Sequence, residues 1–212
     1  MKPLIIVESP SKAKTISKYL GGAYEVMSTI GHIKQLPRER LSVDIENDFA
    51  IEDEIIEDKK KLVNELKKIS KSAPEVIIAT DSDREGEAIA ADIASEIDKS
   101  KISRVQFTEI TKQGVQTGLE ERKEIDNDLV KAATTRRIVD RLFGYKISPV
   151  LWSTLQSNMN FVKVNLSAGR VQSAALKILI DRERLRQKFI PAIYFDLKAD
   201  FEIDKDTFNA TL

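Results

Sequence analysis

Hydrophobic residues in the first half of the chain gather in short, wholly apolar runs. Leu4–Val7 and Val76–Ala79 are the clearest of these runs, and weaker strand patterns cover Tyr24–Thr29 and Arg104–Phe107. Strands that are buried on both faces of a parallel sheet have continuous apolar sequences rather than alternating ones. We therefore expect these four segments to be strands of a mainly parallel sheet.

Segments with helical spacing lie between the expected strands. One of them follows Lys12 and ends near Gly21, a usual helix stop. Others cover Lys59–Ile69 and Ala88–Ile97. Strands that alternate with helices predict an α/β fold with helices on both faces of the sheet. We assign this α/β domain to residues 1–122.

The pattern becomes purely helical after residue 122. Asp126–Tyr145, Pro149–Gln156 and Ala168–Phe189 have helical spacing, with no strand pattern between them. We therefore expect a partial helical domain at residues 123–190.

A strand-like alternation of polar and apolar residues returns at Ile193–Phe201. No partner strand is recognisable between this segment and Leu212, and a lone strand cannot satisfy its backbone hydrogen-bonding groups. We therefore interpret residues 191–212 as the start of a β domain, and the chain as a piece of a longer protein.

Composition excludes several kinds of site. The chain has 212 residues, no cysteine and a single histidine, His32. A disulfide framework, a thiolate metal site and a multi-histidine metal centre are therefore excluded. The start of the chain has no signal-peptide pattern, and no apolar run is long enough to span a membrane. These features predict a cytoplasmic protein that does not insert into membranes.

Charge is segregated along the chain although the net charge is zero. Residues 1–100 contain 15 Lys+Arg and 20 Asp+Glu, whereas residues 101–190 contain 17 Lys+Arg and 9 Asp+Glu. An acidic front half beside a basic middle is the distribution that a metal site next to a polyanion-binding groove requires. Ordinary solvated helix faces produce similar counts, so charge alone leaves both interpretations open.

Three carboxylates follow the expected strand at Val76–Ala79. Asp81, Asp83 and Glu85 are spaced by two, so in an extended backbone they project to one side. Crowded carboxylates repel one another unless a cation neutralises them, and oxygen-only ligands beside a helix start suit Mg²⁺. The alternative is a solvated loop before a helix whose first turn favours acids. Arg84, embedded in the motif, adds a fixed cation that suits a phosphate.

Glu8 directly follows the expected strand at Leu4–Val7, and Lys12 stands one helical turn further on. Ligands of open α/β sheets bind at the carboxyl ends of strands, so we expect Glu8 and Asp81 to converge at one edge of the sheet. Glu8 is then a candidate metal ligand or general acid, and Lys12 a candidate cation for a phosphate. Considered alone, the two residues are equally well a helix-start glutamate and a surface lysine.

The basic middle of the chain offers candidate contacts to a nucleic acid. Arg136 and Arg137 are adjacent on an expected helix and can bracket a phosphate chain, although adjacent arginines are also common on solvated faces. The small residues of Ser167–Ser173 open another helix, where free amides form an anion site or a serine simply caps the helix. Tyr145 and Trp152 can stack on bases or belong to the core.

Taken together, these motifs closely resemble those of type IA DNA topoisomerases, the bacterial topoisomerase I branch in particular. The resemblance covers nearly the whole chain, and the motifs occur in the order of the family. The matching segments are Ile6–Ile16, Gly31–Ile33, Ala79–Ala90, Phe107–Thr111, Arg136–Arg141, Gly144–Pro149 and Leu166–Ser173.

The resemblance implies a TOPRIM α/β domain followed by the beginning of the helical domain that grips single-stranded DNA. Enzymes of this family cut one DNA strand, hold its 5′ end on a tyrosine, pass another strand through and reseal the break. They relax negatively supercoiled DNA with Mg²⁺ and without ATP. The resemblance therefore implies single-stranded DNA and negatively supercoiled duplex DNA as partners, and we expect a monomer.

The resemblance also implies roles for individual residues. Glu8 acts near the leaving 3′ oxygen, as an acid in cleavage and a base in resealing, while Lys12 and Arg84 neutralise phosphate charge. The carboxylates that hold Mg²⁺ are those of Glu8, Asp81, Asp83 and Glu85. The positions that correspond to DNA contacts are His32, Arg136, Arg137, Asp140, Tyr145, Trp152, Ser167, Ala168, Gly169, Arg170, Val171 and Gln172.

The chain departs from the family pattern in three places. Ser82 stands where the family usually has proline, which should change loop stiffness rather than metal binding. Residues 153–165 form a longer stretch than in the commonest members. None of the 4 tyrosines stands in the context of the catalytic tyrosine, so we expect the chain alone not to cleave DNA covalently.

Three alternative functions stay open. A topoisomerase III-like decatenase shares these motifs. Another TOPRIM enzyme, such as a nuclease or a primase, shares the acidic part of the pattern. A purely binding module for single-stranded DNA is the third alternative.

Overall fold

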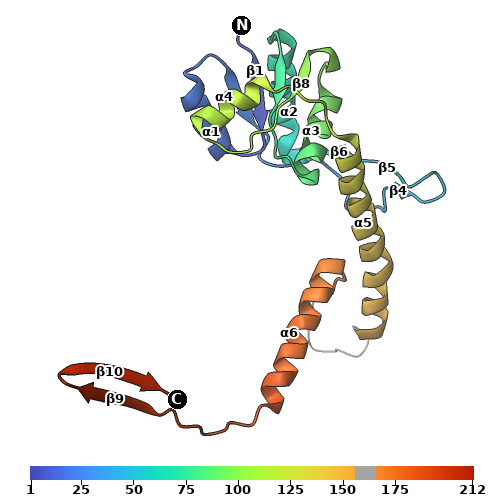
Figure 1. Cartoon of the computed structure of the whole chain (residues 1–212). Coiled ribbons are helices and arrows are strands. Elements are labelled where there is room, and N and C mark those ends of the chain that lie inside the picture. Colours follow the sequence, from blue (N-terminus) through green and yellow to red (C-terminus); the bar gives the residue numbers. More distant parts are fainter. Residues whose placement is uncertain (156–165) are drawn as a thin grey trace. The chain divides into compact units, whose positions relative to one another are not determined.

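The structure, a computed structural model, describes residues 1–155 and 166–212 (Figure 1). The chain forms two compact units, Met1–Ala168 and Gly169–Leu212. The domain boundaries expected at residues 122 and 190 stay a prediction. The expected longer stretch at 153–165 lies mostly outside the described residues.

Four parallel strands form the central sheet of the first unit, in the order β2-β1-β7-β8 (Figure 1). Their bounds are Leu4–Val7 for β1, Glu25–Ser28 for β2, Val76–Ile78 for β7 and Ile102–Arg104 for β8. β1 and β7 lie in the middle of the sheet, and each of their residues is buried. The predicted α/β class with a mainly parallel sheet is confirmed.

The last strand of the sheet begins and ends earlier than the expected Arg104–Phe107. β8 pairs with β7 only up to Arg104, because β7 has just 3 residues and the chain leaves the sheet after Ile78. Val105 still donates its N–H to the Ile78 carbonyl, at 2.9 Å. The expected segment therefore covers the last residue of the strand and the first residues beyond it.

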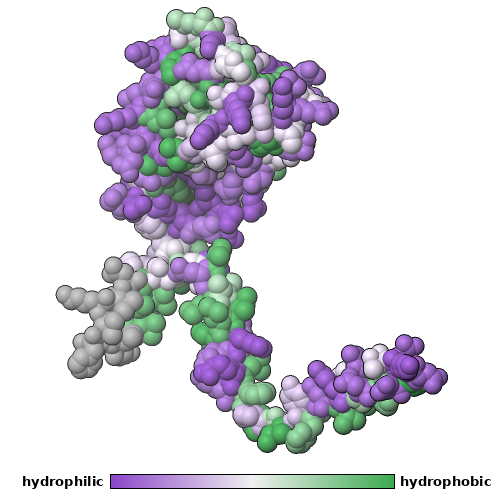
Figure 2. Space-filling model, turned by 90° about the vertical axis from the view of Figure 1, so that its left-hand side faces the viewer, coloured by the Kyte–Doolittle hydropathy of each residue, from purple (hydrophilic) through white to green (hydrophobic). Residues whose placement is uncertain are grey.

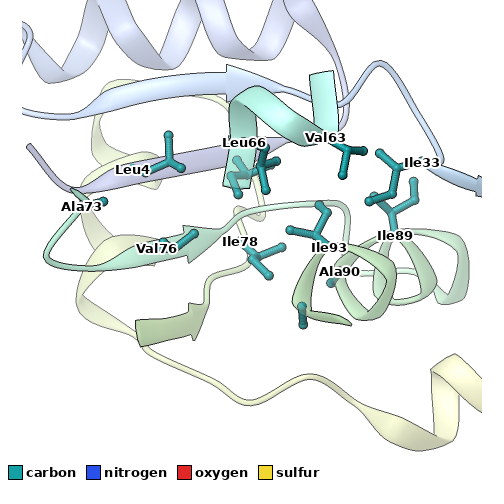
Figure 3. Close-up of a cluster of buried hydrophobic side chains, with 12 residues drawn as sticks. Leu4, Ile33, Val63, Leu66, Ala73, Val76, Ile78, Ile89, Ala90 and Ile93 are labelled. Atoms are coloured by element: carbon teal, nitrogen blue, oxygen red, sulfur yellow. The ribbon is translucent and has the colours of Figure 1, made fainter. Parts of the chain in front are cut away.

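Helices cover both faces of the sheet. Alternate residues of β1 face opposite layers: Leu4 and Ile6 lie in a buried cluster with α2 and α3, whereas Ile5 and Val7 lie with α1 and α4. Figure 3 shows the first of these clusters, with side chains of both helices against the strands. The helix bounds are Pro10–Leu20 for α1, Lys60–Ser72 for α2, Arg84–Glu96 for α3 and Lys112–Glu120 for α4.

Two short antiparallel strand pairs follow β2. β3, Lys34–Gln35, pairs with β6, Glu54–Ile55, and β4, Val43–Asp44, pairs with β5, Ala50–Ile51. Pairs this short leave no hydrophobic periodicity, so the sequence does not predict them. Single 3₁₀ turns precede α2 and β8, at Glu57–Lys59 and Lys99–Lys101.

One long helix, α5, covers Asn127–Leu155. Asp126 caps its start, because Asp126 Oδ1 accepts the N–H groups of Asp128 at 2.9 Å and Leu129 at 3.1 Å. The expectation of two helices separated before Pro149 is wrong. A proline removes one N–H donor from a helix, but its φ angle is compatible with helical backbone, so α5 continues through Pro149.

The second unit consists of α6, Arg170–Lys188, and a hairpin of β9, Lys198–Ile203, with β10, Asp206–Thr211. The expected lone strand at Ile193–Phe201 is wrong in position and in having no partner. The turn between the strands uses positive φ angles at Asp204 and Lys205, where Asn-Gly is the usual sequence signal. Asp204-Lys205 is not such a sequence, so the turn and the strand β10 after it could not be predicted from the turn signal.

None of the described helices is long and apolar enough to span a membrane.

Candidate functional site

Glu8 and Asp81 meet at the carboxyl edge of the sheet. Glu8 follows β1 and Asp81 lies in the loop after β7, and these two strands are neighbours. The Asp81 N–H donates to Glu8 Oε2 at 3.1 Å. The two acidic residues are thus held together although they are far apart in the sequence.

The ammonium group of Lys12 bridges the two carboxylates. It contacts Glu8 Oε1 and Asp81 Oδ1. Partial burial works to lower the pKa of Lys12, but the hydrogen bonds to Asp81 and Glu8 outweigh it and raise the pKa above its usual value. α1 places this lysine, because Ser9 caps the helix by accepting the Lys12 N–H at 3.3 Å.

The bridging ammonium shows that this edge accommodates a cation. Two carboxylates from neighbouring strand ends supply hard oxygen ligands, which is the donor chemistry that Mg²⁺ prefers. Within residues 1–155 and 166–212, no group of three or more His, Cys, Asp or Glu side chains is arranged to hold a metal ion. The predicted four-carboxylate ligand set therefore stays a prediction.

Asp83 and Glu85 have different surroundings from Asp81. Asp83 is the N-cap of α3, and its Oδ1 accepts the Gly86 N–H at 2.8 Å. Glu85 belongs to the first turn of α3, so the backbone is no longer extended and a spacing of two no longer selects one side. The expectation of a common side applies to extended backbone, and Glu85 does not meet that condition. Arg84 is the exposed first residue of α3.

Glu85 faces the long helix α5 and the loop after β2. Its Oε1 lies 3.3 Å from Arg136 Nη1, and its Oε2 lies 3.6 Å from His32 Nε2. The other ring nitrogen of His32 lies 3.7 Å from Asp92 Oδ2, a buried oxygen with no hydrogen-bond partner among the described residues. The third carboxylate of the motif therefore links the acidic edge to basic residues of other elements.

A cavity of about 990 Å³ opens beside Glu85, entirely within the first unit. The loop that contains β3 forms part of its lining and α5 forms another part. The predicted site residues in its lining are His32, Glu85, Arg137, Asp140, Tyr145, Trp152, Ser167 and Ala168. Arg136 is outside the lining and contacts Asp140 Oδ2 at 3.8 Å.

The sequence missed three basic residues of the cavity, Lys34, Arg38 and Arg141. The Arg141 guanidinium donates to the carbonyls of Leu36 and Pro37, at 3.0 and 2.9 Å, and lies 5.3 Å from the centroid of the Tyr145 ring. Tyr145 itself donates its hydroxyl to the Arg38 carbonyl at 2.7 Å. Arg141 and Tyr145 are four residues apart, a spacing that places two side chains on the same face of a helix. This spacing is the sequence signal that could have identified the pair.

The far end of α5 is joined to the segment after residue 165. Trp152 Nε1 donates to the Leu166 carbonyl at 2.6 Å, and the Ala168 N–H donates to Ser148 Oγ at 3.0 Å. Ser167 and Ala168 thereby reach the cavity lining.

The remaining predicted contacts, Gly169, Arg170, Val171 and Gln172, belong to the second unit. Gly169 is the N-cap of α6 and Arg170 its first residue, so Ser167 does not cap this helix. The predicted role of these residues in DNA binding stays a prediction.

Two family models match the chain. The model described as Toprim domain matches residues 3–110, and the model described as DNA topoisomerase matches residues 124–211. Among solved structures, full-length topoisomerase I from Thermotoga maritima matches with 45% sequence identity and a TM-score of 0.74. The match covers 93% of this chain and 32% of that chain, so this chain spans about a third of the length of that protein.

Proposed function

Because the chain belongs to the bacterial type IA DNA topoisomerase family, we propose that it provides the acidic edge and strand-binding groove of a topoisomerase. The proposed enzyme relaxes negatively supercoiled DNA without ATP, by cutting one strand, passing another through the break and resealing it. Its proposed partners are single-stranded and negatively supercoiled duplex DNA. The predicted cytoplasmic location and monomeric state are part of this proposal.

One observation carries the proposal. Residues 79–83, which carry Asp81 and Asp83, form the acidic loop. Glu85 lies directly after this loop in the first turn of α3, lines the cavity and contacts Arg136 of α5. The helix that follows the acidic loop therefore brings one carboxylate of the motif into a cavity whose lining includes Arg38, Arg137 and Arg141. A phosphate chain that follows these arginines is led to the carboxylates, where phosphoryl chemistry needs them.

Glu8 and Lys12 are the proposed proton-transfer and phosphate-binding residues of this edge. Glu8 would give a proton to the leaving 3′ oxygen during cleavage and take it back during resealing. Lys12 and Arg84 would neutralise the charge of the phosphate. Lys12 now satisfies two carboxylates at once, so a bound phosphate competes with Glu8 and Asp81 for this ammonium.

Mg²⁺ fits the oxygen donors of this edge, and we assign its binding to Glu8, Asp81, Asp83 and Glu85. When bound, the ion supplies positive charge that positions the phosphate and the DNA ends. The chain's own part is to keep Glu8 and Asp81 within contact of one cation, and the contact of both carboxylates with the Lys12 ammonium supports this role.

Stacking on bases and backbone contacts account for the other residues. Trp152 is half exposed in the cavity lining and offers a ring face to a base, while Arg137 and His32 offer positive or hydrogen-bonding groups to phosphates. Asp140 holds Arg136 in place through its carboxylate. Ser167 to Gln172 are further proposed contacts to DNA. The chain alone, without a tyrosine in the family's catalytic context, should form no covalent DNA adduct.

The proposal is tested by strand binding to the 212-residue chain. We expect a fluorescent single strand to bind with an affinity that falls steeply with salt, because phosphate contacts release counterions. Arg137→Ala should weaken binding about fivefold and lower the salt slope by about 0.7, the contribution of one phosphate contact on a single strand. Fluorescence anisotropy over a salt series measures both quantities.

Arg122→Ala is the matched control, because Arg122 pairs with Glu75 at 3.3 Å and does not line the cavity. It should leave the affinity unchanged. Binding that ignores salt, or an equal loss in both variants, would contradict the proposed groove.

A further inference from the structure

Glu87 is a buried carboxylate that the proposed chemistry does not use. It lies on α3, directly after the acidic loop, and its side chain is 0% exposed. A buried charge needs a partner of opposite charge and further hydrogen bonds. Glu87 Oε1 accepts from Arg104 Nη2 at 2.7 Å, from Arg104 Nε at 3.0 Å and from Gln106 Nε2 at 3.0 Å.

Arg104 connects this carboxylate to the backbone of the acidic loop. Its Nη2 donates to the Asp81 carbonyl at 2.8 Å, and its Nη1 donates to the Ile78 carbonyl at 3.1 Å. Ile78 is the last residue of β7, and Asp81 is the first acidic residue of the loop that follows it. The guanidinium therefore fixes where the Asp81 backbone lies.

The second oxygen of Glu87 reaches the start of α5. Glu87 Oε2 accepts the Asp126 N–H at 3.1 Å, and Asp126 is the residue that caps α5. Further along the same helix, Arg136 contacts Glu85 in the first turn of α3. α5 is thus attached to the start of α3 at two points, one buried at Glu87 and one at the cavity.

We propose that Glu87 is a positioning residue that couples the acidic loop to the start of α5. A cation held by Glu8 and Asp81 reduces the motion of the loop. Because Arg104 and Glu87 connect the loop to Asp126 by hydrogen bonds, the start of α5 also becomes less mobile. A strand that then binds along α5 loses less conformational entropy, so Mg²⁺ and the strand bind cooperatively. This inference takes its two ligands, Mg²⁺ and a DNA strand, from the proposed function. The contacts of Glu87 and Arg104 do not depend on that function.

The test compares Glu87→Gln with Glu96→Gln in the 212-residue chain. Glutamine at position 87 turns an amide NH₂ toward either Arg104 or the Asp126 N–H, both of which are donors. Glu96 lies on the same helix and accepts from Lys34 at 2.7 Å and Lys67 at 2.6 Å. It therefore controls for the loss of a largely buried acid that does not bond the loop or α5.

The first readout is the ratio of single-strand dissociation constants without and with Mg²⁺, measured by anisotropy. We expect Mg²⁺ to tighten binding about fivefold in the unmodified chain and in Glu96→Gln, and less than about twofold in Glu87→Gln. A purely structural defect lowers the active fraction in both conditions and leaves the ratio unchanged. An unchanged ratio in Glu87→Gln overturns the proposal.

The second readout needs no DNA. Hydrogen exchange of the amides in 127–137 should slow when Mg²⁺ is added to the unmodified chain and to Glu96→Gln, but not to Glu87→Gln. If the unmodified chain binds no strand, the proposed function fails while this measurement still decides the coupling. An α5 that does not respond to Mg²⁺ in the unmodified chain overturns the inference.

A second variant covers the case in which Glu87→Gln does not fold. Arg104→Lys keeps a cation for Glu87 but lacks the fork that also reaches the Asp81 carbonyl. We expect it to lose the Mg²⁺ effect on α5 in the exchange measurement. A full Mg²⁺ effect in Arg104→Lys would contradict the assigned route.

Discussion

Gly86 lies where the acidic loop turns into α3, and its missing side chain lets the loop close. A Cβ atom at this position would lie 2.2 Å from the Asp81 carbonyl oxygen and 2.9 Å from the Asp81 nitrogen. Thr80 Oγ1 donates to the Gly86 carbonyl at 2.7 Å, and Asp83 accepts the Gly86 N–H. The backbone of the acidic loop is therefore folded tightly onto this one residue.

We predict that Gly86→Ala destabilises the chain by about 1–3 kcal/mol, the usual cost of forcing extra atoms into a packed site. The clashing atoms belong to the Asp81 backbone, so they cannot move aside as a flexible side chain can. Urea unfolding followed by circular dichroism measures the change.

Gly144→Ala is the comparison for this measurement. A Cβ atom at Gly144 meets only the Ala168 carbonyl oxygen, at 3.7 Å, an ordinary contact. Alanine there should leave stability unchanged or raise it by up to about 1 kcal/mol, because it favours helix. Equal stability of the two variants would mean that the loop does not close on Gly86.

The elements of the first unit owe their stability to the sheet, whereas the β9–β10 hairpin has no such support. The side chains of β10 are all exposed. The rings of Phe201 in β9 and Phe208 in β10 stack with their centroids 5.1 Å apart. A two-stranded hairpin by itself is only marginally stable in water.

We predict that amides of β9 and β10 in the 212-residue chain exchange at least about a hundredfold faster than those of β1. Core strands exchange only through openings that cost several kcal/mol, and a marginal hairpin opens almost freely. Hydrogen exchange measured by NMR or mass spectrometry tests this. Protection of the hairpin equal to that of β1 would show that another surface supports it.

The buried core of the whole chain is concentrated in its first unit. The buried apolar side chains lie between Leu4 and Ala133, and none of residues 169–212, all of which the structure describes, is buried. α6 instead exposes Ile178 and Leu179, and Figure 2 shows apolar side chains over much of its surface. Cooperative unfolding should therefore belong to the first unit.

We predict that a chain ending at Ala168 unfolds cooperatively, with a Tm within about 4 °C of the 212-residue chain, the shift that 1 kcal/mol produces. A chain ending at Arg122 is the control, since it loses Asp126 and the buried Ala133 of α5 and should melt lower. Calorimetry measures both. A large loss in the longer truncation would show that the second unit stabilises the first.

Local patterns were sufficient for the sheet and for part of the site. The apolar runs at Leu4–Val7 and Val76–Ala79 identify β1 and β7, because burial on both faces leaves a continuous apolar sequence. Once these strands are neighbours, Glu8 and Asp81 must share an edge. The motif order also indicated the family, which the family-model matches confirm.

Other features depend on contacts between distant residues, which no local pattern records. Asp83 starts α3 by accepting the Gly86 N–H, and Glu85 in that first turn contacts Arg136 whereas Asp81 contacts Lys12. Short antiparallel pairs such as β3–β6 form only because the surrounding chain brings them together.

The amino-acid order alone thus specifies which segments are buried and which residue types stand at the ends of strands, since burial follows a short repeat. Folding in three dimensions decides which of those residues face one another. The clearest case is the carboxylate of Glu87, which joins Arg104 to the start of α5 across loops and layers. Such a partner is chosen by packing and by the need to satisfy a buried charge, and neither leaves a periodic mark in the sequence.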